Sequence, residues 1–120
     1  EEVAGEVAAK APKYKVLRIL LNQSGTNDPS IVVLENTTGE DPTAERLGAD
    51  GVYRINHSMI VPGSCIMTPS PIDMLNNLVA VYYGMSTGLV NVLTGDISSF
   101  PTVSTTDNIL DHTPMQILFY

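Results

Sequence analysis

The stretch that decides the fold is YKVLRILLNQSGTNDPSIVVLENTTG, which runs from Tyr14 to Gly39. Two apolar runs, 14–21 and 31–34, flank the segment 22–29, which is dense in Asn, Ser, Gly, Asp and Pro. Short β-prone runs separated by turn-forming residues are typical of strands joined by a turn. The stretch therefore predicts a strand, a turn and a second strand.

The same pattern continues along the chain. We expect strands near 13–22, 30–35, 51–56, 64–68, 76–84, 88–94, 100–104 and 115–120. Short strands with turn signals at this spacing predict one all-β domain over residues 13–120. Its expected architecture is an antiparallel β-sandwich, jelly-roll-like or Ig-like. Residues 43–47 fit one helical turn, and 72–78 fit either a helix or a strand.

Residues 1–12, EEVAGEVAAKAP, differ in composition from the rest of the chain. Val3 and Val7 lie four residues apart, on one face of a short predicted helix that Pro12 ends. Such a segment is too short to be a stable helix alone. It is either a frayed N-terminal tail or the end of a shaft or anchor that pairs with other chains. The start at Glu1, without methionine, indicates a fragment, a trimmed chain or a processed product.

Two predicted strands are apolar on both faces, and such strands must be covered twice. In the first strand, Leu17, Ile19 and Leu21 share one face while Val16 and Leu20 share the other. The last strand is also apolar on both sides. We expect sister chains to cover the second face, as a homotrimer or else a dimer, although a second sheet of the same chain is an alternative. The predicted interface residues are Val3, Val7, Val16, Leu20, Leu118 and Tyr120.

The other apolar positions of the strands predict the core. We expect it to contain Tyr14, Leu17, Ile19, Leu21, Val33, Tyr53, Ile55, Val79, Val81, Val92, Ile117 and Phe119.

Charge and composition exclude several classes of partner. Six basic residues against thirteen acidic ones give a formal net charge of −7, so we expect no nucleic-acid binding, which needs a clustered positive surface. We expect no membrane span, because no apolar run reaches the length of about 18 residues that one needs. Cys65 is the only cysteine, so an intrachain disulfide is excluded, and its apolar neighbours predict a buried, inert thiol.

Candidate catalytic residues are scarce. His57 and His112 lack a second ligand at metal-binding spacing. Asp111 precedes His112, but Asp-His before a proline is common turn chemistry. The serines lack the Gly-x-Ser-x-Gly setting, and the segment 84–88 lacks the lysine of a phosphate loop. We therefore expect no enzyme activity, no catalytic or cofactor-binding residue, no cofactor and no metal.

The string LLNQSGTNDP at residues 20–29, followed by VLENTTG at 33–39, resembles a recurring opening of one protein family. The family consists of structural proteins of tailed phages that infect Bacteroidetes bacteria, including the crAss-like phages. Its members typically read LLxQSGTxxPxxxVLENTxG, then GxY, and end on alternating apolar and Tyr residues. This chain supplies 51–53 and 117–120 for the later elements but lacks the tryptophan that often stands between the first two. The centre, 57–112, shows no such likeness.

The resemblance implies a virion protein, a head fibre or capsid-decorating domain that assembles in the host bacterial cytoplasm. Its expected partners are copies of itself and other virion proteins such as the capsid. One alternative is a carbohydrate- or receptor-binding sandwich at a fibre tip, which would stack a host glycan on exposed Tyr53, Tyr82 or Tyr83. Another is a bacterial surface domain derived from an integrated phage.

Overall fold

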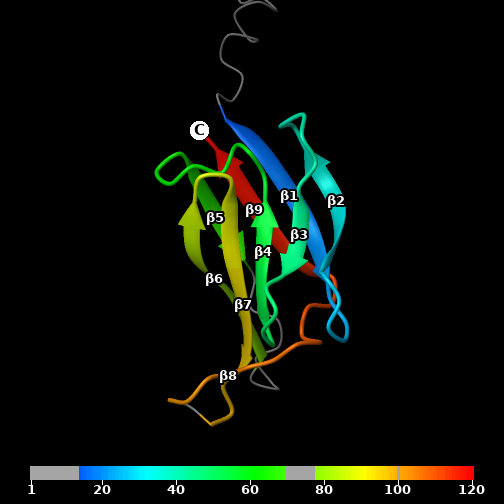
Figure 1. Ribbon diagram of the computed structural model, residues 1–120. Coiled ribbons are helices and arrows are strands. Elements are labelled where there is room, and N and C mark those ends of the chain that lie inside the picture. The colour runs from blue at the N-terminus through cyan, green and yellow to red at the C-terminus, as the bar shows by residue number, and fades with distance from the viewer. Residues whose placement is uncertain (1–13, 70–77, 100) are drawn as a thin grey trace, which may run out of the picture.

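The computed structural model describes residues 14–69, 78–99 and 101–120, with nine strands in two antiparallel sheets (Figure 1). The strands are β1 (Lys15–Asn22), β2 (Ser30–Asn36), β3 (Thr43–Arg46), β4 (Val52–Asn56), β5 (Cys65–Pro69), β6 (Leu78–Ser86), β7 (Leu89–Asp96), β8 (Ser104–Thr105) and β9 (Thr113–Phe119). The first sheet has the order β2-β1-β9-β5, and the second has β3-β4-β7-β6 with β8 paired to β7. This arrangement confirms the predicted β-sandwich.

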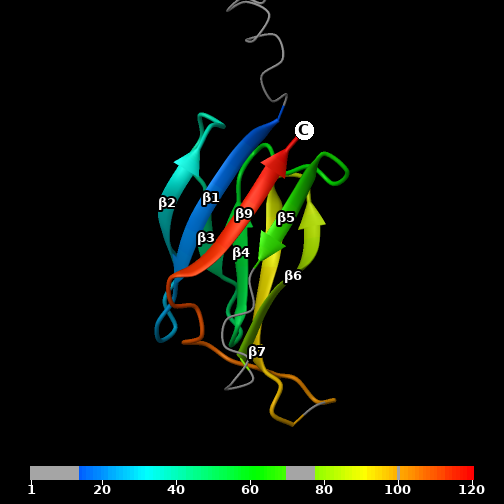
Figure 2. The ribbon, with the colours of Figure 1, turned by 180° about the vertical axis from the view of Figure 1, so that it is seen from behind.

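The first sheet contributes one face of the core through the predicted two-residue alternation. Leu17 lies opposite Ile117 and Ile19 opposite Met115 on the paired strands β1 and β9, and all four side chains are buried. Burying one such side chain contributes about 1.5–3 kcal/mol. Figure 2 shows β2, β1, β9 and β5 side by side in this sheet.

The second sheet packs against these residues. Tyr53 and Ile55 of β4 lie opposite Val92 and Val90 of β7, and all four are buried. Between them, Arg54 points to the other side of the sheet. The expected burial of Tyr53 and Ile55 is therefore confirmed.

The helical turn expected from the local sequence at residues 43–47 is wrong. These residues do not form a helical turn, because Thr43–Arg46 is the strand β3, antiparallel to β4. The pairing satisfies backbone groups of β4, and this outweighs the weak helical preference of these five residues. The strand expected at 100–104 is also shorter, since β8 covers only Ser104 and Thr105.

Three residues of the expected core are exposed. Tyr14, at 50% exposure, precedes β1 and lies at the end of the sheet. Val33 is 42% exposed because it lies on the edge strand β2, and Val81 is 44% exposed on the edge strand β6. Val79 is partly buried. The remaining eight expected core residues are buried: Leu17, Ile19, Leu21, Tyr53, Ile55, Val92, Ile117 and Phe119.

Position 51 requires glycine both because its backbone angle is unfavourable for other residues and because a side chain there would collide with neighbouring backbone. Its φ is +72°, and an added Cβ would lie 2.6 Å from the backbone nitrogen of Thr106. Any larger residue would push the segment after β8 away from the start of β4. Gly51 therefore sets how closely these two segments approach.

Candidate functional site

A buried polar cluster surrounds Asp107, in the segment between β8 and β9. The Asp107 side chain is 8% exposed. Arg46 of β3 donates to it from Nε and Nη2, the latter 2.8 Å from Oδ2. The amide of Gly51 donates to Oδ1 at 2.9 Å, and the Tyr53 hydroxyl lies 2.6 Å from the same oxygen. One carboxylate thus joins β3, β4 and the segment before β9.

Gln23 continues this cluster at the end of β1. Its Oε1 accepts from the amide of Asn108 at 2.8 Å and lies 2.9 Å from the Tyr53 hydroxyl. Its Nε2 donates to the carbonyl oxygens of Gly25 and Asn27. The hydroxyl of Tyr53 has one hydrogen, and the closer, charged carboxylate of Asp107 is the better acceptor. Gln23 therefore holds the turn between β1 and β2 against the segment at 107–108.

The contacts shift two protonation equilibria. The Arg46 guanidinium, followed by the Gly51 amide and the Tyr53 hydroxyl, holds the pKa of Asp107 well below its ordinary value despite burial. Burial, followed by the hydrogen bond to Asp107, raises the pKa of Tyr53 well above its ordinary value. In the described ranges, every buried side-chain nitrogen and oxygen has a hydrogen-bond partner. The cluster is thus a structural link in which the buried polar side-chain atoms are all paired.

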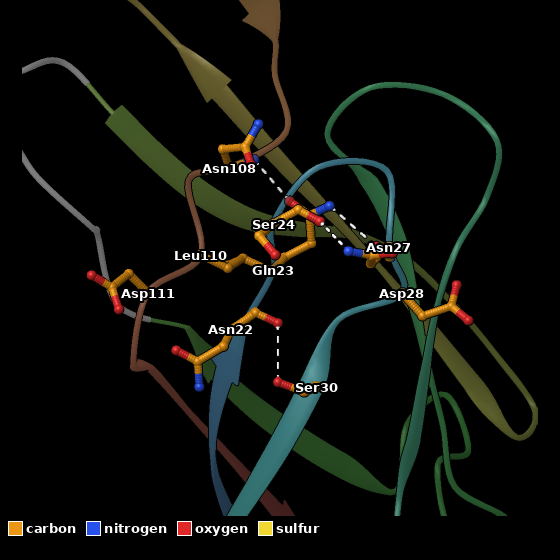
Figure 3. Close-up of a pocket in the computed structure, with 9 residues that line it drawn as sticks. All are labelled: Asn22, Gln23, Ser24, Asn27, Asp28, Ser30, Asn108, Leu110 and Asp111. Carbon is orange, nitrogen blue, oxygen red and sulfur yellow. Dashed lines mark hydrogen bonds between the residues drawn. The ribbon is translucent and has the colours of Figure 1, made fainter.

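A polar hollow of about 580 Å³ lies in front of this cluster, at the turn between β1 and β2 (Figure 3). Its lining consists of Asn22, Gln23, Ser24, Asn27, Asp28, Ser30, Asn108, Leu110 and Asp111. The two charged side chains in it, Asp28 and Asp111, are both acidic, so the hollow disfavours anionic ligands such as phosphate. The sequence predicted only a turn at 22–29, because residues 108–111 join it through the tertiary fold.

The outer face of the first sheet holds the predicted interface residues that the structure describes. Val16 lies opposite Leu118, which in turn lies opposite Ile66 of β5. Leu20 lies opposite Val32 of β2. Val16, Leu20 and Leu118 are partly buried, and Tyr120 beside them is 64% exposed. Val3 and Val7 lie outside the described residues.

A polar row crosses the middle of this outer face. Arg18 pairs with Glu35 on one side, with Nη1 3.0 Å from Oε1, and donates from Nε to Gln116 on the other at 2.8 Å. A hollow of about 550 Å³ extends from this row toward Tyr14, the residue before β1. The outer face is therefore apolar at both ends and charged in the centre.

His57, a candidate functional residue from the sequence, lies in the core of the structure. The ring is 1% exposed and stacks on Phe119 with the centroids 5.3 Å apart. Its Nδ1 accepts from the amide of Met59, so Nε2 carries the hydrogen and faces the Glu40 carbonyl oxygen at 2.9 Å. Through its hydrogen bond to Glu40, His57 thus links the segment before β3 to the end of β4.

The other two residues singled out in the sequence, His112 and Cys65, lie in different settings. His112 bonds Asp111 at 2.7 Å, but both side chains are more than 70% exposed, so nothing shields the pair from water. Cys65 is buried, with its sulfur 3.6 Å from that of Met85, which confirms the predicted burial. In the described part of the chain, no group of three His, Cys, Asp or Glu residues is placed to hold a metal ion.

Comparison of the chain with protein families, curated proteins and solved structures finds no match. Among the described residues there is no helix long and apolar enough to cross a membrane.

Proposed function

We propose that this chain is a non-enzymatic structural domain of a phage particle, of the head-fibre or capsid-decorating type. It acts by self-association, with a homotrimer as the expected assembly, and by docking to other virion proteins. The resemblance of residues 20–39 to phage structural proteins supports the location.

The observation that carries the proposal is the outer face of the first sheet. The core between the sheets is complete, yet Val16, Leu20 and Leu118 form a second apolar surface on the opposite side of β1 and β9. Apolar side chains gathered on a sheet face and bordered by polar residues are typical of protein interaction sites, and this supports the proposal. The central pair Arg18–Glu35 supplies charges that fix how a partner sits.

A carbohydrate-binding role is the second candidate, and the polar hollow at the turn between β1 and β2 favours it. Its amide, hydroxyl and carboxylate groups suit a polyol. However, none of the nine lining residues is aromatic, and Tyr53, expected as a stacking platform, is 1% exposed. The side chains of Tyr82 and Tyr83 lie outside the described set. A glycan array tests this candidate directly, and a saturable hit that Asn27→Ala abolishes would favour it.

The main proposal is tested by a substitution that places a charge on the outer face of the first sheet. Leu118→Asp should dissociate the assembly, because a carboxylate would lie against the apolar surface of a sister chain. Val103→Asp is the matched control, since Val103 is 45% exposed in the segment before β8, away from this face. Light scattering should give the single-chain mass for Leu118→Asp and the assembled mass for Val103→Asp. Equal masses for the two variants would contradict the role of the outer face.

Location is tested separately. An antibody raised against the domain should label purified phage particles from the bacteria that carry the gene, at the head or its projections. Particles that contain the major capsid protein but no trace of this chain would contradict a virion role.

A further inference from the structure

Among the residues that the structure describes, the two edges of the first sheet present unpaired backbone. Within the described chain, β2 pairs with β1 alone and β5 with β9 alone. β2 also carries three consecutive exposed apolar residues, Val32, Val33 and Leu34, at 46%, 42% and 59% exposure, and β5 carries Ile66 at 52%. An exposed apolar edge strand is a template for pairing with another strand.

The edge strand β3 of the second sheet, by contrast, has features that disfavour pairing with a strand of another chain. It has four residues and ends on Glu45 and Arg46, both held in ion pairs. Short, charged edges resist strand addition. β2 has seven residues, and Glu35, the only charged residue on β2 or β5, is neutralised by Arg18. A bulge at Leu34 interrupts the register with β1 but leaves residues 30–33 regular.

Strand direction determines which edges fit together. Each strand of the order β2-β1-β9-β5 is antiparallel to its neighbour, so the two outermost strands run in opposite directions. A second copy in the same orientation therefore presents its β5 antiparallel to β2. Antiparallel pairing of β2 with β2 would instead need the second copy turned end over end.

The point where the chain enters the sandwich selects between these two arrangements. Tyr14, the first described residue, lies at the end where the C-terminus also lies, since Lys15 is opposite Phe119 (Figure 2). Copies in the same orientation bring Tyr14 of every chain to one end, whereas copies turned end over end place these residues at opposite ends. The shaft or anchor expected at residues 1–12 pairs with other chains, so it requires every copy to enter from one end.

We propose that β2 of one copy pairs with β5 of a second copy in the same orientation, joining their first sheets edge to edge. This inference rests on the self-association in the proposed function and adds an edge contact to the outer face proposed there. A contact between two different edges repeats from copy to copy, and it closes into a ring when the rotation between copies allows. Three copies form such a ring in the expected homotrimer.

Cysteine cross-linking tests the pairing in the full chain. The background is Cys65→Ala, which removes the single native thiol. Ile66→Cys is combined in turn with Ser30→Cys, Val32→Cys and Leu34→Cys, which sample the register along β2. Cysteines opposite each other on paired strands lie within disulfide range. Under mild oxidation, at least one double variant should form covalent dimers and closed trimers, while every single variant should stay a single chain on a non-reducing gel.

The outcomes separate the two proposals. Dimers from Val32→Cys or Leu34→Cys alone would overturn the inference in favour of β2 pairing with itself. Absence of cross-links in every double variant, with the assembled mass unchanged in light scattering, would also overturn it and leave self-association standing. A single-chain mass for the native protein would overturn both. As a second readout, Val32→Lys should lower the assembled fraction at least tenfold while Val103→Lys leaves it unchanged, and equal effects would contradict the edge contact.

Discussion

The hydroxyl of Tyr53 lies 2.6 Å from Oδ1 of Asp107, a residue 54 positions further along the chain. Tyr53 reaches it from near the start of β4, while Asp107 follows β8 of the second sheet. The same carboxylate also binds Arg46 and the Gly51 amide. One side chain thus closes the end of the sandwich where β1, β3 and β4 meet.

Removing the Asp107 charge should destabilise the fold strongly. Asp107→Asn leaves the Arg46 guanidinium without its buried counter-ion, and breaking a buried pair in this way costs about 3–5 kcal/mol. Urea unfolding followed by fluorescence or circular dichroism measures the loss. Asp50→Asn is the matched control, because Asp50 binds the same guanidinium but is 73% exposed, and exposed pairs contribute little. Equal losses for the two variants would contradict the assigned role of Asp107.

Stability should fall in acid through the same residue. The pKa of Asp107 is lowered in the folded chain from its ordinary value of 3.8. The contribution is therefore fully present above that ordinary value and is lost as the pH falls toward the folded pKa. The urea midpoint should drop as the pH falls from about 5 to about 2, and Asp107→Asn should show a shallower drop. A variant with the same pH dependence as the native chain would exclude Asp107 as the cause.

Gly51 should tolerate no side chain. Gly51→Ala adds a methyl group 2.6 Å from the Thr106 nitrogen, in a backbone conformation with φ of +72°. Gly48→Ala is the control, since Gly48 has φ of +82° but open space around it. The backbone term of about 1–2 kcal/mol should appear in both variants, and Gly51→Ala should lose about 1–3 kcal/mol more through overpacking. Thermal melting ranks the two, and a larger loss for Gly48→Ala would contradict the close approach.

Ile117 should be among the most costly core residues to truncate. It is completely buried opposite Leu17 and faces the second sheet, so Ile117→Ala should cost about 2–5 kcal/mol. The exposed Val103→Ala should change the unfolding free energy by less than about 0.5 kcal/mol. A loss below half a kilocalorie for Ile117→Ala would mean that the assignment of faces on β9 is wrong.

The alternation of apolar residues predicted the sandwich and most of its core, because strand periodicity is a local property. It assigned Leu17 and Ile19 to one face and Val16 and Leu20 to the other, as the structure has them. It misplaced Val33 and Val81, because alternation tells which side chains share a face but not whether another layer covers them. Both residues lie on edge strands.

The polar cluster could not be predicted from sequence. Arg46 and Asp107 are 61 residues apart, and Arg46 was expected in a helical turn rather than in β3. The pairing of β3 with β4 and the close approach at Gly51 bring the two charges together. Neither feature has a signal within a short window of sequence.

The most direct test of the central claim is the mass of the full chain in solution. Sedimentation equilibrium at micromolar concentration and physiological salt should give three times the single-chain mass of 12.9 kDa. The assembled fraction should rise with added salt, because the formal charge of −7 on each copy opposes association until it is screened. A mass of 12.9 kDa at every concentration and salt level would contradict self-association and leave a monomeric sandwich.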